Sequence, residues 1–220
     1  PDVGFTSFIN KLPEGVGMYL MLTATQLNAA DTQSIGLTDF YISSSYKEHT
    51  ADLLTKLDWK NNSDDNNSMI KNFFKEACSE KAARTKYPEP QLIFRLEEIK
   101  KITKGGSMKE ITENILNLQG DEWLVKGAER FKKGCPTSAL IIWEQCNNYS
   151  YLTLKEVFKF ELNLAIQVTR RSDFLEGIRA AIIDKDSSPE WHFKTIDDVP
   201  YNWIQDHLKP AWLDNPLDDL

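Results

Sequence analysis

Paired cysteines, long apolar runs and an excess of positive charge are all missing from this 220-residue sequence. Its three cysteines (Cys78, Cys135 and Cys146) contain no CxxC pair, so we expect reduced, buried thiols in a cytosolic-type protein. No run approaches the ~18 consecutive apolar residues that a membrane span needs. The net charge is −7, and a surface that negative repels phosphate backbones. We therefore expect neither nucleic acid nor a membrane as a partner.

Signals for metal ions, nucleotides and secretion are also missing. The three histidines (His49, His192 and His207) lie far apart and lack the spacing of zinc ligands. No nucleotide-binding loop or nucleophile elbow is found, so the residues alone imply no cofactor. The chain begins with Pro1 and has neither a basic n-region nor an apolar h-region. We expect no signal peptide, and we expect the sequence to be part of a longer or processed protein.

What the chain does have is a periodic pattern of apolar residues. Hydrophobic residues make up 41% of the sequence and charged residues 27%, which is the usual globular mixture. At about 150 residues per domain, the length corresponds to roughly one or two domains. Apolar residues recur at spacings of three and four along most of the chain, which indicates helices. Residues 37–42 are the best candidate for a strand. We predict a mostly α protein with at most one or two strands.

Polar residues mark the predicted helix ends and loops. Asn28 is predicted to cap a short helix that has Asp31 in its first turn and stops at Gly36. The most polar stretch, 61–68, is predicted to be a surface loop. A helix over about 154–168 is expected to turn Val157, Phe158, Leu162 and Ala165 inward. Three capping boxes are predicted, each pairing an N-cap residue with a carboxylate three positions later: Ser107 with Glu110, Thr153 with Glu156, and Asp173 with Glu176.

Several segments carry a family resemblance. In chain order they are Pro1-Asp2-Val3-Gly4; Leu22-Thr23-Ala24, Leu27-Asn28-Ala29-Ala30-Asp31 and Gly36-Leu37-Thr38-Asp39; Cys135-Pro136-Thr137-Ser138; Leu154-Lys155-Glu156-Val157; Asp173-Phe174-Leu175-Glu176-Gly177-Ile178-Arg179-Ala180; and IIDKDSSPEW over 182–191. Together they resemble the C-terminal part of the crotonase (enoyl-CoA hydratase/isomerase) superfamily, and most closely its 3-hydroxyisobutyryl-CoA hydrolases. The resemblance runs through the whole chain in order, is strong at both ends, and is weak between Ser43 and Ala128.

This resemblance implies a fold and a division of the chain. It implies the helical C-terminal portion of an α/β crotonase-like (ClpP/crotonase) fold. Residues 1–45 would end the crotonase core and include the PDVG active-site turn. Residues 46–134 would form a helical insertion, and residues 135–220 would cover the pocket and form contacts. In the family, the oxyanion-hole amides, the main coenzyme A loop and a catalytic Glu precede the PDVG turn. We therefore expect little or no turnover from the 220 residues alone.

The resemblance also implies an activity. That activity is hydrolysis of the thioester 3-hydroxyisobutyryl-CoA, a step of valine breakdown, with coenzyme A as part of the substrate and no other cofactor. The implied partners are an acyl-CoA, a second copy of the chain, or the N-terminal half of the same enzyme. A bacterial member would be cytoplasmic, and a eukaryotic one would lie in the mitochondrial matrix. Enoyl-CoA hydration or isomerisation, and a non-catalytic helical module for oligomerisation or interaction, remain the alternatives.

Asp2 and Gly4 are the candidate site residues at the start of the chain. The resemblance implies that Asp2 works with an upstream Glu, orienting substrate or water and shuttling a proton. As a residue type, Asp2 is equally explained as a helix N-cap. Gly4 suits a close approach of the backbone to a ligand. Phe5-Thr6 departs from the small residues usual in these hydrolases, so Phe5 either packs in the core or narrows the acyl pocket.

Lys185 is the candidate near the end of the chain. It resembles the position from which a C-terminal lysine approaches the phosphates or adenine of coenzyme A, and Arg179 is a weaker candidate for the same contact. The alternative is that Lys185 is an ordinary solvated surface lysine without a role in binding. Glu176 is better explained as the acid of a capping box than as a catalyst.

Overall fold

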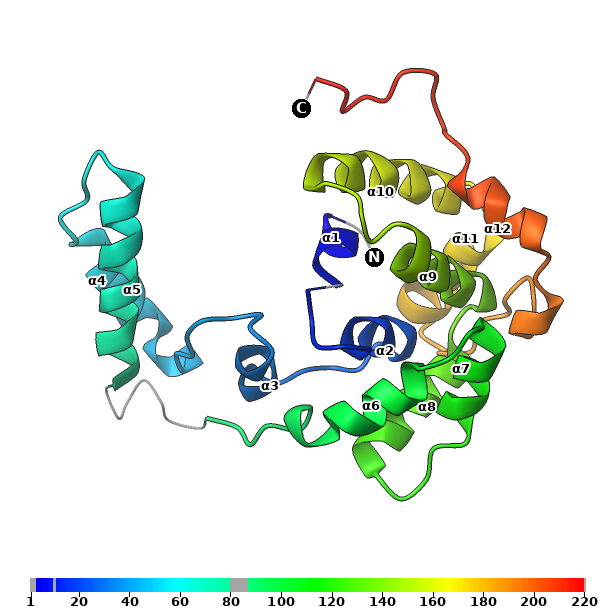
Figure 1. Cartoon of the computed structure of the whole chain (residues 1–220), viewed down its shortest axis with the longest axis horizontal. Helices are drawn as coiled ribbons and strands as arrows, with labels where there is room; N and C mark the ends of the chain where they lie inside the picture. The colour runs from blue at the N-terminus through cyan, green and yellow to red at the C-terminus, as the bar shows by residue number, and fades with distance from the viewer. Residues whose placement is uncertain (1–2, 10, 80–86, 220) are drawn as a thin grey trace. The chain divides into compact units, whose positions relative to one another are not determined.

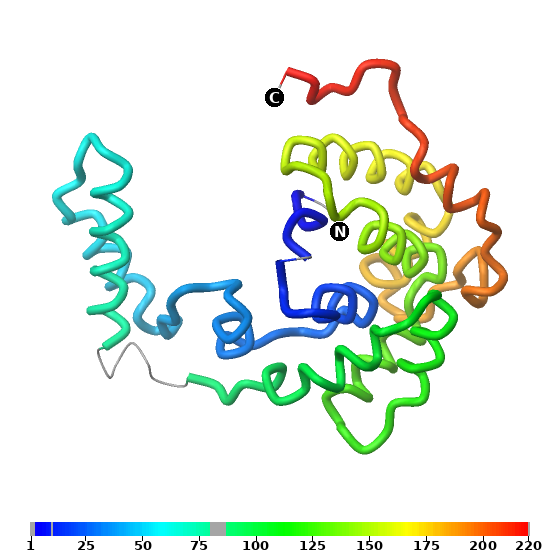
Figure 2. The backbone as a smooth tube through the Cα atoms, viewed as in Figure 1, coloured from blue at the N-terminus to red at the C-terminus, as the bar shows by residue number. Residues whose placement is uncertain are grey.

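A computed structural model describes residues 3–9, 11–79 and 87–219 of the chain, and these residues contain helices but no β-strand (Figures 1 and 2). The chain divides into two compact units. The first unit comprises residues 1–26 and 96–220, and the second comprises residues 27–95. These limits differ from the segment limits at 45 and 134 that the family resemblance implies. The division by role that the resemblance implies stays a prediction.

The first unit is built from nine α-helices and two other short helical segments within the described residues. They are α1 (Phe5–Ile9), α2 (Val16–Thr23), α6 (Leu96–Thr103), α7 (Met108–Leu116), α8 (Glu122–Lys133), α9 (Pro136–Asn148), α10 (Leu154–Thr169), α11 (Ser172–Ile178), the π-helical turn η3 (Arg179–Ile183), η4 (Ile196–Asp198) and α12 (Tyr201–Leu208).

Helix α2 is the centre of the first unit. Its sequence, VGMYLMLT, carries no charge and is apolar on every side, so it is stable only where other helices surround it. It contacts α1, α6, α8 and α9, and its Val16 and Tyr19 are fully buried. A second cluster joins α9, α10, α12 and the residue after η4 through Ile141, Leu164, Ile204 and Val199. Helix α10 contacts α1, α11 and α12, so it links the N-terminal turn to the C-terminal helices.

The second unit contains three α-helices and two 3₁₀ turns in its described residues: α3 (Ala29–Ser34), η1 (Ser44–Tyr46), α4 (Lys47–Thr55), α5 (Ser63–Ser79) and η2 (Ile93–Arg95). The predicted capping of α3 is confirmed, because Asn28 and Asp31 form a reciprocal capping box. Asp31 is 1% exposed, and the same carboxylate also accepts the backbone N–H groups of Gln91 and Leu92. This one side chain therefore joins both ends of the unit.

The predicted strand over 37–42 is wrong, since these residues are irregular. Their apolar side chains are covered by other side chains of the same unit instead of being paired in a sheet. The ring of Phe40 stacks on Phe74 of α5 with centroids 5.4 Å apart, and Tyr41 meets Tyr87 edge-on at 4.9 Å. A short apolar run signals burial, and the neighbour that buries it decides its backbone conformation.

The predicted loop over 61–68 is also wrong beyond its first two residues, because α5 begins at Ser63. Asp64 and Asp65 lie in the first turn, where the helix dipole favours negative charge. Asn66 exchanges two hydrogen bonds with the backbone of Lys60, which fixes the chain entering the helix. The polar composition therefore reflects an exposed helix start.

Of the capping boxes, Thr153 with Glu156 is confirmed at the start of α10. Ser107 caps α7 as predicted, but the Glu110 carboxylate accepts the N–H of Gly106, one residue earlier than a capping box requires. Within the described residues, none of the helices combines the length and the apolar character that crossing a bilayer requires.

Helices α1 and α2 approach closely because Gly17 has no side chain. A Cβ at Gly17 would lie 2.6 Å from the backbone oxygen of Ile9, a contact that real Cβ atoms essentially never make. We predict that Gly17→Ala forces α1 away from α2 and lowers the free energy of unfolding by about 1–3 kcal/mol. The measurement is urea unfolding of the full-length gene product.

Gly106→Ala is the control for this prediction. The nearest atom to a Cβ at Gly106 is 3.8 Å away, so the change should stay within about 0.5 kcal/mol. Equal stability of the two variants would contradict the close approach at Gly17.

Candidate functional site

The N-terminal turn has an unusual backbone conformation. Val3 and Gly4 have φ angles of 50° and 93°, so two consecutive residues lie in the left-handed region. That region is costly for a β-branched residue such as Val3 and is free for glycine. A Cβ at Gly4 would also lie 3.3 Å from the ring of Phe158. Glycine therefore suits position 4, and surrounding contacts must hold Val3 in place.

Glu161 provides those contacts. Its side chain is only 3% exposed and comes from the middle of α10. The N–H of Gly4 donates to one carboxylate oxygen at 2.5 Å, and the N–H of Thr6 donates to the other at 2.7 Å. Hydrogen bonds to an ionised acceptor are stronger than neutral ones, and the first N–H groups of a helix have no partner within the helix. One carboxylate thus caps α1 and fixes the turn before it.

Gln145 provides a further hydrogen bond that holds the start of α1. Gln145 Nε2 in α9 donates to the hydroxyl of Thr6 at 3.0 Å, and both side chains are fully buried. The start of α1 is therefore attached to α9 and α10, and the end of α1 rests on Gly17 of α2. Figure 1 shows α1 beside α9 and α10. The residues Phe5-Thr6, which depart from the small residues usual in the family, thus place a buried hydroxyl in this junction.

Sequence reasoning missed both Glu161 and Gln145. Glu161 lies three and four positions after Phe158 and Val157, on the face of α10 that was predicted to point inward. A carboxylate on an apolar helix face is a signal, because an acidic side chain is almost never fully buried without partners. The buried face of α10 carries Val157, Glu161 and Leu164, whereas Ala165, which was predicted to point inward, is exposed.

Asp2, the predicted catalytic residue, lies outside the described residues, so its role stays a prediction. The sequence places it two positions before Gly4, whose backbone N–H is held by Glu161. Gly4 lies within the turn itself, where its N–H faces Glu161 and its backbone approaches Phe158. Whether the backbone of Gly4 also approaches a substrate stays a prediction.

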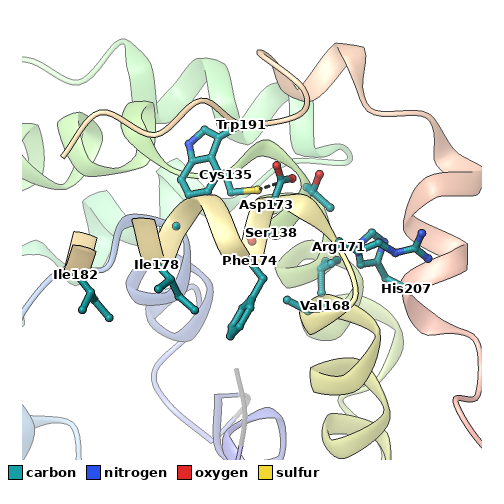
Figure 3. A pocket seen from close by; sticks show the side chains of 13 residues that line it. Cys135, Ser138, Val168, Arg171, Asp173, Phe174, Ile178, Ile182, Trp191 and His207 are labelled. Carbon is teal, nitrogen blue, oxygen red and sulfur yellow. Dashed lines mark hydrogen bonds between the residues drawn. The ribbon is translucent and has the colours of Figure 1, made fainter. Parts of the chain in front are cut away.

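A cavity of about 280 Å³ lies in the C-terminal part of the first unit, between α9, α10, α11 and the segment that leads to α12 (Figure 3). Its lining includes Ile141, Val168, Phe174, Ile178 and Trp191. The lining is mostly apolar but also includes Arg171, Asp173 and His207.

The surroundings of the cysteine in this cavity disfavour a thiolate. Cys135 donates from its sulfur to Asp173 at 3.3 Å, the dashed line in Figure 3. Burial raises the pKa of the Cys135 thiol, and the nearby Asp173 charge acts in the same direction. The thiol therefore stays protonated at neutral pH, whereas a nucleophilic cysteine needs a lowered pKa.

The predicted capping box of Asp173 with Glu176 is wrong. Helix α11 begins at Ser172, and both carboxylates are turned toward the segment that follows η3. Asp173 accepts the N–H of His192 at 2.7 Å, and Glu176 accepts the N–H of Glu190 at 2.7 Å. A carboxylate prefers whichever donors the tertiary structure brings within reach, and here those donors lie 14 and 19 residues away.

Arg179 completes this network. It forms a two-pronged ion pair with Glu176 and single ion pairs with Asp184 and Asp186 at 2.7 Å. Arg179 lowers the pKa of the Glu176 carboxyl to about 2, with help from the N–H of Glu190. A guanidinium that already binds three carboxylates has little capacity left for phosphate, which disfavours Arg179 for the coenzyme A contact; that contact stays a prediction.

Lys185 stands apart from the network. It lies between Asp184 and Asp186, has a φ angle of 56°, and its side chain is exposed. Arg179 already binds both neighbouring carboxylates. Across residues 3–9, 11–79 and 87–219, no ion pair engages the Lys185 ammonium and no hydrogen bond joins it to the turn at Gly4. A free, outward-facing lysine is compatible with phosphate binding, but that contact stays a prediction.

The histidines of the first unit have structural contacts. His207 is buried and its Nδ1 lies 2.7 Å from the backbone oxygen of Trp203, and burial lowers the pKa of its imidazole. His192 stacks on the ring of Trp203 with centroids 5.1 Å apart. Among the residues that the structure describes, no group of three or more His, Cys, Asp or Glu side chains could hold a metal ion.

Comparison with known proteins adds the family context. Residues 1–208 match the family model described as enoyl-CoA hydratase/isomerase. The chain is 32% identical over 213 residues to human mitochondrial 3-hydroxyisobutyryl-CoA hydrolase, covering 95% of the chain and 52% of that protein. The Danio rerio counterpart is 30% identical over 204 residues, covering 93% of the chain and 52% of that protein. The chain thus spans about half the length of the curated relatives it matches.

Solved structures show the same fold. A carnitinyl-CoA dehydratase from Mycobacterium thermoresistibile aligns with a TM-score of 0.80 at 17% identity, covering 99% of this chain and 58% of that one. An enoyl-CoA hydratase from Rhodobacter sphaeroides aligns with a TM-score of 0.70 at 22% identity, covering 96% of this chain and 56% of that one. The helices are therefore the helical portion of a crotonase fold, as expected from the sequence.

The Arg179 network predicts how stability depends on acid. Because the folded pKa of Glu176 is about 2 against an ordinary 4.5, its contribution is complete above about pH 4.5 and is lost as the pH falls toward 2. We predict that Glu176→Gln lowers the melting temperature at about pH 6, and that the gap from the parent protein narrows steadily below about pH 4.5. Thermal melts over this pH range test it.

Glu129→Gln is the control, since Glu129 is an exposed residue of α8 without an ion pair among the described residues. Its melting temperature should follow that of the parent protein at every pH. A gap for Glu176→Gln that is independent of pH would show that the carboxyl does not contribute through its charge.

Proposed function

Because the chain belongs to the enoyl-CoA hydratase/isomerase family, we propose that it is the C-terminal part of an acyl-CoA thioester hydrolase that acts on 3-hydroxyisobutyryl-CoA. The names of relatives at 27–32% identity support this substrate. The structural observation that carries the proposal is the pinned turn after Asp2, in which Glu161 fixes the backbone at Gly4 and Thr6. A carboxylate used in catalysis needs such a fixed support.

In this proposal Asp2 orients the substrate or the attacking water and carries a proton. The water oxygen bonds to the thioester carbonyl carbon, the carbon–sulfur bond breaks, and a proton passes to the sulfur of coenzyme A. The products are 3-hydroxyisobutyrate and free coenzyme A. Stabilising the oxyanion requires preorganised N–H donors. By the family resemblance, these donors and a partner Glu belong to segments outside these 220 residues.

The other elements of the proposal concern binding and location. Lys185 would contact the phosphates of coenzyme A, which enters as part of the substrate, and the proposal includes no metal or other cofactor. The remaining half of the enzyme, or a second copy of the chain, would complete the acyl-CoA site. The relatives are named as mitochondrial proteins, which favours the mitochondrial matrix over the cytoplasm.

Replacing Asp2 tests the proposed catalysis. We predict that the full-length gene product releases coenzyme A from 3-hydroxyisobutyryl-CoA and that Asp2→Asn slows release ~100-fold or more, the scale of a lost acid–base group. A thiol-reactive dye measures the release. A parent protein that hydrates an enoyl-CoA but releases no coenzyme A would overturn the hydrolase proposal in favour of a hydratase.

Replacing Lys185 tests the proposed coenzyme A contact. Loss of an exposed charge on phosphate should raise KM about 3- to 10-fold and leave kcat unchanged, and the difference should shrink at high salt. Lys101→Ala, which removes an exposed lysine of α6, is the matched control and should leave KM unchanged. Equal KM values for Lys185→Ala and the parent protein would make Lys185 an ordinary surface residue.

A further inference from the structure

We propose that Glu161 is a positioning residue, which fixes the backbone at Gly4 and Thr6 and thereby supports catalysis through the turn that follows Asp2 in the sequence. The proposal rests on the proposed function, since it gives Asp2 a catalytic role. Glu161 itself takes no part in the chemistry. It acts through the backbone, by holding the two N–H groups that follow Asp2 in the chain.

The geometry of the two hydrogen bonds is the first argument. The N–H groups of Gly4 and Thr6 meet the two oxygens of a single carboxylate, at 2.5 and 2.7 Å. Two bonds to one planar group fix the orientation of the peptide segment as well as its distance. The same peptide segment carries the left-handed φ angles of Val3 and Gly4. Loss of either bond would release the strain at Val3.

The burial of the charge is the second argument. Glu161 is 3% exposed, and in the part of the chain that the structure describes no lysine or arginine forms an ion pair with it. A buried carboxylate is costly unless hydrogen bonds satisfy it, so its two amide donors cannot leave without a large loss. The turn is therefore held more stiffly than by a serine or asparagine cap, whose side chain is neutral.

The surroundings of the turn are the third argument. Gln145 binds the Thr6 hydroxyl from α9, and Gly17 lets α2 approach the other end of α1. These contacts hold the helix α1 in place. They do not engage the backbone N–H groups that precede Thr6. Among the described side chains, Glu161 is the one that accepts the N–H groups of Gly4 and Thr6.

A double-mutant cycle tests the proposal in the full-length gene product. In Glu161→Gln one carboxylate oxygen becomes an NH₂ group, which cannot accept from either amide. We expect kcat for 3-hydroxyisobutyryl-CoA to fall about 10- to 100-fold, the range expected for a misplaced catalytic group, and KM to change less. In an Asp2→Asn background the same replacement should cost less than about 2-fold. Losses that multiply in the double variant would overturn the proposal.

Gln167→Leu is the matched control for general destabilisation. Gln167 is a buried residue of the same helix and donates one hydrogen bond to the backbone oxygen of Lys209, away from the turn. It should lower the melting temperature yet keep kcat per folded molecule. Glu161→Asp retains both acceptor oxygens on a shorter arm and should recover part of the kcat that Glu161→Gln loses. Equal kcat losses in Gln167→Leu and Glu161→Gln would contradict a specific role.

Amide hydrogen exchange gives a readout that is independent of activity. Exchange at the N-terminal turn should accelerate at least about 10-fold in Glu161→Gln, while exchange in α12 stays unchanged. If the parent protein releases no coenzyme A, the proposed function is wrong, and exchange of the Gly4 and Thr6 amides alone decides whether Glu161 fixes the turn. Unchanged exchange at these amides would overturn the inference.

Discussion

The hydrogen bonds from Gly4 and Thr6 to the buried Glu161 carboxylate are the constraint on which the first unit depends. They join residues more than 150 positions apart in the chain, and they convert a five-residue helix that could not persist alone into a fixed element. A buried charge enforces this arrangement, because the carboxylate must retain its donors. Helices α1, α9 and α10 therefore form one junction at the point where the candidate catalytic residue precedes the turn.

A carboxylate that accepts backbone N–H groups is also found in the second unit, where the buried Asp31 accepts such groups from both ends of that unit. The same kind of contact lies beside α11, where Asp173 and Glu176 hold the segment before α12. Carboxylates that accept backbone amides take the place that sheet hydrogen bonds have in other folds. Asp173, Glu176 and Arg179, which belong to the segments that resemble family motifs, therefore have structural contacts, and the Lys185 side chain is exposed.

Sequence reasoning succeeded where the signal is local. The Thr153 capping box and the Asn28 cap follow from residues within one helical turn. It failed where a distant neighbour decides. Residues 37–42 are covered by side chains such as Phe74 instead of being paired in a sheet, and Glu176 accepts the backbone N–H of Glu190, 14 residues away, instead of its own helix start. Nothing within a few residues of either segment reveals Phe74 or the backbone of Glu190.

By itself the sequence determined a mostly helical, acidic chain, because helical periodicity and capping depend on neighbouring residues. Its motifs also pointed to the crotonase family. Only the tertiary structure decided which carboxylates are structural and which groups stay exposed. It buried Glu161 against the N-terminal turn and enclosed Arg179 among three acids. The physical reason is that a carboxylate binds whichever donors the packed helices place within about 3 Å of it, and that placement is a property of the whole fold.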